Sequence, residues 1–487
     1  MKNRIVEELE RILPLVKNPG RYIGGEANQV VKDPSVLLAS VALLFPDAYE
    51  LGMSHNGTKV LYHVINREPD LAAERAFAPM PDMADQLKRS GIPLYTLESY
   101  RPIRDFSAVG ISLQTELNYT NVPYLLELSG LAAFSKDRAE GDPFVIGGGP
   151  CMANPEPVAD FFDLFVIGDG EVLAVQILRV IGAGRREGKA KLDILKDLAA
   201  LKGVYAPTLL PVVESPFGEL IPPVDGSQGP YLRAKSVQRA WVEVLNKEDY
   251  PVKNLVPHMK LVHDRFSVEV MRGCTQGCRF CQAGYWYRPV RELDPADVVK
   301  MTKAFIAESG WSEVGLLSLS TADYSQIEPL VRCLAPELSE RRVSISLPSL
   351  RAEAFSVGLA DAVSEVRKSG FTFAPETGSD RLRRVINKTF TNADMIQAAD
   401  VAFGRGWDLI KVYTMIGLPT ETTSDLDELV TLVEGILARG RKYGRRKEVN
   451  VSVGPFVPKS WTPFQWAPFD GVDVLERKLA YLKDRFR

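Results

Sequence analysis

The chain has 487 residues, 45% hydrophobic and 25% charged, which is the composition of a globular protein too long for one ordinary domain. A formal net charge of −3 excludes a global attraction to nucleic acid or to a membrane surface. No window resembles a transmembrane span, because the longest apolar runs are strand-sized, and the N-terminus lacks a signal-peptide core. We therefore expect a cytoplasmic protein whose five cysteines, three of them clustered, do not form a disulfide framework.

Residues 1–37 predict a helix followed by a loop. Apolar side chains recur at helical spacing over residues 1–20, and Pro19 and Gly20 end the pattern. We therefore place this segment before the first domain.

Residues 38–204 alternate strand and helix patterns, which predicts an open, doubly wound, Rossmann-type α/β sheet. Strands are expected at 41–45, 108–112, 144–146 and 164–167, and helices at about 57–66, from about 121 and from 171. Such sheets bind ligands beyond the carboxyl ends of their strands, where glycine permits close approach of the backbone. The candidate binding residues are Ser112, Gly147, Gly148, Gly149, Gly168, Gly170 and Glu171. The alternative is that the glycines form tight turns in a sheet that binds nothing.

Recurrent prolines in residues 205–262 predict an extended linker with a small β element. From residue 263 to 487 the strand–helix alternation returns. Strands are expected at 267–271, 313–319, 343–347, 370–374, 409–414 and 449–453, with helices such as 295–308 and 424–438 between them. Six such units predict a partial (β/α)6 barrel, whose active site lies at the carboxyl ends of the strands.

Three cysteines, Cys274, Cys278 and Cys281, follow the first strand of this barrel with the spacing C-x3-C-x2-C. A structural zinc would need a fourth ligand, and none is apparent: His263 precedes the strand and Cys333 is isolated. The other interpretation is a 4Fe–4S cluster in which three thiolates bind three irons and the fourth iron stays open.

The cysteine spacing, with Phe280 directly before the third cysteine, resembles the signature of radical S-adenosylmethionine enzymes. This resemblance implies that the open iron chelates the amino and carboxylate groups of S-adenosylmethionine. An electron from the cluster then cleaves the sulfonium to methionine and a 5′-deoxyadenosyl radical. It also implies a small electron-donor protein of the flavodoxin or ferredoxin type, and no membrane partner.

The resemblance further implies S-adenosylmethionine contacts after successive barrel strands. The candidates are Phe280, Ser320, Thr321, Arg351, Glu376 and Gly417. The segment 318–321 departs from the glycine-rich pattern of the family at that position. Arg351 suits the methionine carboxylate and Glu376 the ribose hydroxyls or the ammonium, but each residue has a structural alternative near a helix end.

An α/β domain before such a barrel resembles enzymes that join a cobalamin-binding domain to a radical S-adenosylmethionine core. The segments 19–26, 49–54, 147–150 and 168–171 resemble an uncharacterised bacterial subfamily of this kind. Cobalamin is thus a candidate second cofactor at the glycine loops. His55 and His63 do not fit D-x-H-x-x-G, so binding would lack a histidine ligand to cobalt. Members of that subfamily usually continue further, so we expect a shortened chain.

We therefore expect a radical S-adenosylmethionine enzyme, and, if cobalamin binds, methyl transfer to an unactivated carbon. One alternative is a radical rearrangement or cyclisation without a corrinoid. Another is a non-catalytic Fe–S protein that acts as a redox sensor or associates with RNA, since the basic run 439–447 could meet phosphates or simply be solvated. Basic residues near the cysteines would suit an anionic cluster or substrate: Arg272, Arg279, Arg288 and Arg291. The lack of a second, upstream cysteine triad argues against a methylthiotransferase.

Overall fold

The computed structural model describes residues 2–210, 213–214, 220–221, 237–347 and 371–486. The chain divides into two compact units, Met1–Asp264 and Arg265–Arg487. None of the described helices is long and apolar enough to cross a lipid bilayer.

The N-terminal unit is built on a six-stranded sheet with the order β2-β1-β3-β4-β5-β6. Its strands are β1 (Ala39–Phe45), β2 (Leu71–Phe77), β3 (Ala108–Ser112), β4 (Phe144–Gly148), β5 (Leu164–Val166) and β6 (Val204–Tyr205). Neighbouring strands from β2 to β5 are parallel, and β6 is antiparallel to β5. Every residue of β1 is buried, as expected for a parallel strand covered on both faces. The predicted doubly wound sheet is therefore confirmed.

Strand β2 and the helix after it were not predicted from the sequence. The strand reads LAAERAF, and Glu74 and Arg75 interrupt its apolar pattern although both side chains are buried. Burial of a charged pair is rare, so the pattern suggests a polar surface segment instead. Only the contacts of these two side chains with other buried groups explain the strand.

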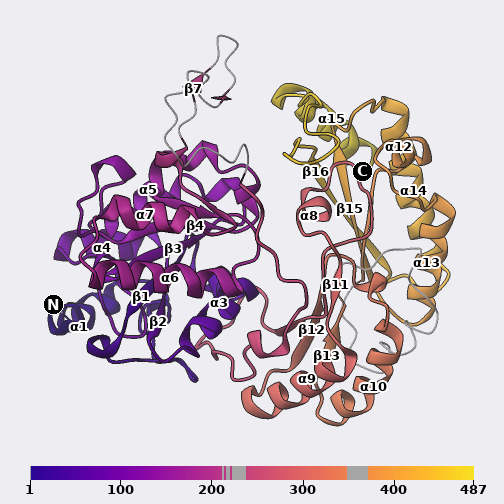
Figure 1. Ribbon diagram of the computed structural model, residues 1–487. Helices are drawn as coiled ribbons and strands as arrows, with labels where there is room; N and C mark the ends of the chain where they lie inside the picture. The colour runs from indigo at the N-terminus through magenta and orange to yellow at the C-terminus, as the bar shows by residue number, and fades with distance from the viewer. Residues whose placement is uncertain (1, 211–212, 215–219, 222–236, 348–370, 487) are drawn as a thin grey trace. The chain divides into compact units, whose positions relative to one another are not determined.

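Helices cover this sheet, and several of them contact one another (Figure 1). They are α1 (Lys2–Ile12), α2 (Tyr49–Gly52), α3 (Asn56–Asn66), α4 (Pro81–Ser90), α5 (Asn121–Leu128), α6 (Glu171–Arg186) and α7 (Lys191–Ala199). Helix α3 packs on β2, and α6 packs on β1 and on α3. The predicted helix over residues 1–20 was too long. It ends at Ile12 and passes into the 3-10 turn Leu13–Leu15, because Pro14 cannot continue the α-helical hydrogen bonds.

Part of the predicted linker packs within the N-terminal unit. The short strands β7 (Val213–Glu214) and β8 (Leu220–Ile221) pair antiparallel, which is the expected small β element. Residues 237–264 then return to the unit, where Ala240 pairs with Gly168 and Val256 with Ala27. Backbone pairing therefore fixes the later part of this segment.

The C-terminal unit contains two three-stranded parallel sheets with the orders β13-β12-β9 and β14-β15-β16. The strands are β9 (Phe266–Glu269), β12 (Glu313–Leu317), β13 (Ser344–Ser346), β14 (Phe371–Glu376), β15 (Leu409–Ile416) and β16 (Glu448–Pro455). Each lies within a few residues of a predicted barrel strand, in agreement with the partial barrel. A short antiparallel pair, β10 (Met271–Arg272) and β11 (Arg291–Glu292), flanks the cysteine segment.

Helices follow the strands of this unit. They are α8 (Gln282–Trp286), α9 (Pro295–Ser309), α10 (Ile327–Glu340), α12 (Asp380–Val385), α13 (Asn392–Gly404), α14 (Thr423–Arg441) and α15 (Val472–Arg485). Of these, α10, α12, α13 and α14 lie along one side of the strands (Figure 1). The apolar faces of α14 and α15 pack with Ile416 of β15 in one buried cluster. This alternation brings the carboxyl ends of the parallel strands to one end of each sheet.

Candidate functional site

The three cysteines lie on a loop that begins just beyond the carboxyl end of β9. Gly273 opens this loop with φ +89°, and a Cβ there would lie 2.7 Å from the Tyr287 carbonyl oxygen. Cys274 is buried, whereas Cys278 and Cys281 are half-buried. Cys281 caps helix α8, because its Sγ accepts a hydrogen bond from the Gly284 amide at 3.4 Å. The loop therefore has a defined path, with two of its three thiols partly open.

Residues from other strands anchor this cysteine loop. The Arg279 amide donates to the Ile386 carbonyl at 3.0 Å, and the Asn387 amide side chain donates to the Gly277 carbonyl at 2.8 Å. From beyond β16, the Phe464 amide donates to the Arg279 carbonyl at 3.1 Å. The loop is thus held by segments that follow β14 and β16.

Phe280 packs partly buried against an apolar cluster beside the loop. The buried members of the cluster are Leu382, Ile386, Leu418 and Phe456. This contact accounts for an aromatic residue at that position through packing, while its predicted contact with S-adenosylmethionine stays a prediction.

Lys388 and Glu376 form an ion pair beside the cysteines that was not predicted from the sequence. Lys388 Nζ lies 2.9 Å from Glu376 Oε1 and donates to the Ala374 carbonyl at 2.6 Å. Burial raises the pKa of the Cys278 thiol, Lys388 lowers it, and Cys281, Cys274 and Glu376 raise it. Cys278 therefore lies within electrostatic reach of the other two thiols and of this ion pair. No periodicity or motif in the sequence indicates Lys388.

The described candidates for S-adenosylmethionine binding lie at carboxyl ends of barrel strands. Glu376 is the last residue of β14 and has φ +65°; Gly417 directly follows β15 and has φ +80°. Ser320 and Thr321 follow β12 and are buried. Arg351 lies outside the described residues.

Ser320 has an unusual environment among these candidates. Its side chain is 2% exposed, yet its hydroxyl has no hydrogen-bond partner among the residues that the structure describes. Thr321, by contrast, accepts a hydrogen bond from Ser318 at 3.0 Å. A buried polar group without a partner is costly, so a ligand that hydrogen-bonds this hydroxyl would be favoured there.

Across the described part of the chain, no three His, Cys, Asp or Glu side chains are close enough to hold a single metal ion. In a 4Fe–4S cluster each thiolate binds a different iron, so the ligands do not converge on one ion. Three thiols on one loop, without a fourth candidate ligand in the sequence, fit such a cluster with an open iron.

In the N-terminal unit the glycine loops follow β4 and β5 at the carboxyl edge of the sheet. Ser112 ends β3, Gly147 and Gly148 end β4, and Glu171 begins α6 after β5. The fold therefore brings these predicted residues to one edge, as the doubly wound topology requires.

Internal packing explains three of the glycines. A Cβ at Gly168, where φ is +123°, would lie 1.9 Å from the Ala240 carbonyl oxygen. At Gly149, where φ is +101°, it would lie 2.6 Å from the Leu113 oxygen, and at Gly147 it would lie 2.5 Å from the Phe165 ring. A Cβ at Gly148 would meet no atom of the described residues within 4 Å. Gly148 is therefore the glycine of this group that leaves open space.

His55 serves as the N-cap of α3. Its Nδ1 accepts a hydrogen bond from the Thr58 amide at 3.1 Å. Burial, and then the positive charge of Lys59, lowers the pKa of His55 to about 4. The neutral ring thus satisfies an amide at the helix start, which gives this histidine a structural role.

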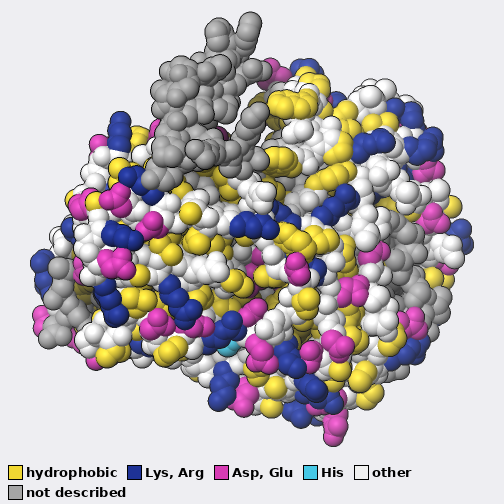
Figure 2. Space-filling model, viewed as in Figure 1, with side chains coloured by type: hydrophobic (Ala, Val, Ile, Leu, Met, Phe, Trp, Pro, Cys, Tyr) yellow, Lys and Arg dark blue, Asp and Glu magenta, His cyan; other side chains and the backbone are white. Residues whose placement is uncertain are grey.

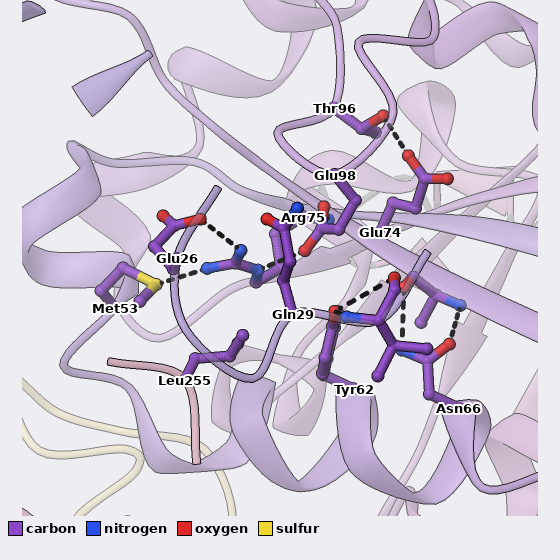
Figure 3. A network of polar contacts seen from close by, with 12 residues as sticks. Glu26, Gln29, Met53, Tyr62, Asn66, Glu74, Arg75, Thr96, Glu98 and Leu255 are labelled. Carbon is purple, nitrogen blue, oxygen red and sulfur yellow. Dashed lines mark hydrogen bonds and ion pairs between the residues drawn. The ribbon is translucent and has the colours of Figure 1, made fainter. Parts of the chain in front are cut away.

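The segments 19–26 and 49–54 contribute to a buried polar network (Figure 3). Arg75 Nη2 lies 3.0 Å from Glu26 Oε2, and Arg75 Nε lies 2.6 Å from Glu98 Oε1. The Tyr49 hydroxyl donates to Glu26 at 3.0 Å, and Arg75 also contacts the Met53 sulfur. The network therefore attaches the N-terminal loop, residues 19–26, to β2.

Basic and acidic side chains are intermingled over the face shown in Figure 2. The basic run 439–447 covers the last residues of α14 and the turn that leads to the amino end of β16. Within it, Lys447 is bound to Asp408 at 2.8 Å and to the Trp407 carbonyl. The run therefore lies at the opposite end of that strand from the residues that hold the cysteine loop.

Two family models match this chain. Residues 57–207 match the model described as radical SAM proteins, N-terminal, and residues 268–433 match that of the radical SAM superfamily. Uncharacterized protein MJ0966 of Methanocaldococcus jannaschii is 29% identical over 89% of this chain and 81% of its own. The threonylcarbamoyladenosine tRNA methylthiotransferase MtaB of Treponema pallidum is 29% identical over 34% of this chain and 35% of its own.

Two solved structures share the fold over most of the chain. The radical S-adenosylmethionine methyltransferase TsrM from Kitasatospora setae, solved with cobalamin and a [4Fe-4S] cluster, has a TM-score of 0.59 and 16% identity. The match covers 87% of this chain and 73% of TsrM. The cobalamin-dependent S-adenosylmethionine radical enzyme OxsB has a TM-score of 0.58 and 14% identity, over 91% of this chain and 61% of its own.

Proposed function

Because this chain belongs to the radical S-adenosylmethionine superfamily, we propose that Cys274, Cys278 and Cys281 hold a 4Fe–4S cluster. A bound cluster would supply the electron that cleaves S-adenosylmethionine to methionine and a 5′-deoxyadenosyl radical. The observation that carries this proposal is the cysteine loop at the carboxyl end of β9, anchored by residues that follow β14 and β16. The barrel thus presents the loop where parallel barrels bind substrates.

Residues at the neighbouring strand ends would hold S-adenosylmethionine. Ser320 offers a buried hydroxyl that lacks a partner within the described ranges, and Glu376 offers a carboxylate to the ribose hydroxyls or the ammonium. The remaining proposed contacts follow the family resemblance: Phe280, Thr321, Arg351 and Gly417. Together these groups would orient the cofactor and exclude water from it.

The N-terminal unit would bind cobalamin at the carboxyl edge of its sheet, and the reaction would then be methyl transfer to an unactivated carbon. Gly148 supports this proposal, because its open side leaves room for a ligand. The shared fold with TsrM and OxsB, which bind cobalamin, also supports it. Because His55 is committed to a helix cap, the cobalt would have no histidine ligand from this residue.

One observation favours a reaction without a corrinoid as the second candidate. Gly147, Gly149 and Gly168 are each required by packing inside the unit, so a ligand is not needed to explain them. The cluster and S-adenosylmethionine would then serve a rearrangement or cyclisation. Absence of corrinoid absorbance after incubation of the protein with cobalamin would select this second candidate.

The cluster requires a reductant and a compartment in which thiolates persist. A small flavodoxin- or ferredoxin-type protein would deliver the electron, and the cytoplasm would keep the cysteines reduced. The first test of the proposal is anaerobic reconstitution with iron and sulfide. Wild-type protein is expected to bind about four irons and give a reduced-cluster EPR signal, as a 4Fe–4S site requires.

Two cysteine variants make this test specific. Cys278→Ala is expected to lose the signal, whereas Cys333→Ala is expected to keep it, because Cys333 is exposed on α10. A wild-type protein that binds no iron, or a Cys278→Ala variant that assembles the cluster normally, would contradict the proposal.

A further inference from the structure

We infer that Lys388 is a positioning residue for the cluster, a fixed positive charge beside the cysteine loop that raises the reduction potential of the cluster. This inference rests on the proposed function. It assigns a role to a residue that neither the cysteine motif nor the candidate S-adenosylmethionine contacts include.

Hydrogen bonds and an ion pair fix both the ammonium group and the backbone of Lys388. Its Nζ donates to the Ala374 carbonyl at 2.6 Å and lies 2.9 Å from Glu376 Oε1. The Lys388 amide donates to the Arg383 carbonyl at 2.9 Å. The side chains of Lys388 and Glu376 are each 15% exposed. A lysine bound in this way has little freedom to turn towards solvent, so its charge stays near β14.

The backbone next to Lys388 touches the cysteine loop directly. Asn387 donates from its side chain to the Gly277 carbonyl at 2.8 Å, and Ile386 accepts from the Arg279 amide at 3.0 Å. A Cβ at Gly277 would lie 2.8 Å from Asn387 Nδ2, so the two segments are in contact. Gly277 and Arg279 flank Cys278 in the sequence, so the segment that carries Lys388 lies against the part of the loop that holds this cysteine.

The arginines that surround the cysteines in the sequence have their own contacts. Arg272 is paired with Glu269 at 2.7 Å, and Arg291 donates to the Tyr287 carbonyl at 3.1 Å. The guanidinium groups of Arg279 and Arg288 donate to the carbonyls of Val385 and Gln276. Lys388 is mostly buried, whereas Arg279 and Arg288 are exposed.

A fixed cation stabilises the more negative, reduced form of a cluster over the oxidised form. Because water and salt screen buried charges weakly, the effect of Lys388 would exceed that of a surface lysine. Charge and hydrogen bonding near the cysteines are known determinants of cluster potential. Removing the charge would also leave the Glu376 carboxylate uncompensated, which disfavours reduction further.

The test is an EPR-monitored redox titration of the anaerobically reconstituted full-length protein without S-adenosylmethionine. For Lys388→Met we expect the ratio of reduced to oxidised cluster at a fixed potential to fall about tenfold, a shift of about 59 mV for a one-electron couple. Lys303→Met is the matched control, because Lys303 is also paired with a glutamate, at 2.6 Å, but is 48% exposed. Its potential is expected to match wild type.

The outcomes separate this inference from the proposed function. A wild-type protein that assembles no cluster contradicts the proposed function, whereas a Lys388→Met protein with full iron content and a wild-type potential overturns the role of Lys388 alone. If Lys388→Met loses the cluster, the reduction potentials of Lys388→Arg and Glu376→Gln test the inference in its place. The inference expects an unchanged potential in Lys388→Arg and a more positive one in Glu376→Gln. No shift in Glu376→Gln would overturn it.

Discussion

Replacing Arg75 with methionine is expected to lower the free energy of unfolding of the N-terminal unit by about 3–5 kcal/mol, the usual loss when one partner of a buried ion pair is removed. Arg75 is 1% exposed, and the side chains of Glu26 and Glu98 are fully buried. Burial alone would lower the pKa of Arg75, but the two carboxylates raise it above its ordinary value. Methionine fills much of the same space but removes the positive charge that both carboxylates contact (Figure 3).

Urea unfolding followed by far-UV circular dichroism measures this loss. Arg179→Gln is the control, since Arg179 also pairs with a glutamate, Glu68, but is 49% exposed. An exposed pair of this kind contributes at most about 1 kcal/mol. A loss for Arg75→Met no greater than that for Arg179→Gln would refute the view that this network attaches the N-terminal loop to β2.

Three further predictions follow from the N-terminal unit. The pKa of His55 is lowered from 6.5 to about 4, so the folded state binds fewer protons than the unfolded state between these values, and stability falls as the pH drops from 6.5 to 4. Wild type should therefore lose about 2–3 kcal/mol over this range in pH-dependent urea unfolding. His55→Asn, which keeps an N-cap, should lose less, and equal slopes would contradict this. Gly148→Val should fold normally and bind cobalamin at least about tenfold more weakly in a spectroscopic titration; unchanged affinity would remove the proposed site. Gly168→Ala should lower the melting temperature because its Cβ would overlap the Ala240 oxygen, and an unchanged melting temperature would contradict that contact.

Strand periodicity predicted most of the fold because each barrel strand is a short apolar run between helix patterns. It missed β2 because Glu74 and Arg75 lie in the strand, and their burial depends on partners from distant segments. The helix predicted over residues 1–20 was too long because the prediction followed the apolar spacing and did not end the helix before Pro14. Local patterns therefore failed where a proline or a tertiary ion pair decided the structure.

In the candidate site, too, the residues marked by local sequence features could be predicted, and the residue placed by tertiary packing could not. The cysteine spacing indicated Cys274, Cys278 and Cys281, and the strand ends indicated Glu376 and Gly417, since these features are local in the sequence. Lys388 could not be predicted, because its relation to the cysteines arises only when the segment after α12 packs on their loop.

The glycine loops show that one sequence feature can have two explanations. Gly168 suggested a ligand contact from its sequence alone, yet its close neighbour is Ala240, some seventy residues away. A glycine in a loop indicates that another group lies close to the backbone, and only the structure shows whether that group belongs to the protein or to a ligand.

Formation of 5′-deoxyadenosine tests the central claim most directly. Reconstituted, reduced wild-type protein, incubated anaerobically with S-adenosylmethionine and analysed by mass spectrometry, should produce 5′-deoxyadenosine and methionine, as should Cys333→Ala. Cys278→Ala should produce neither. A wild-type protein that carries its cluster and forms no 5′-deoxyadenosine under these conditions would contradict the account.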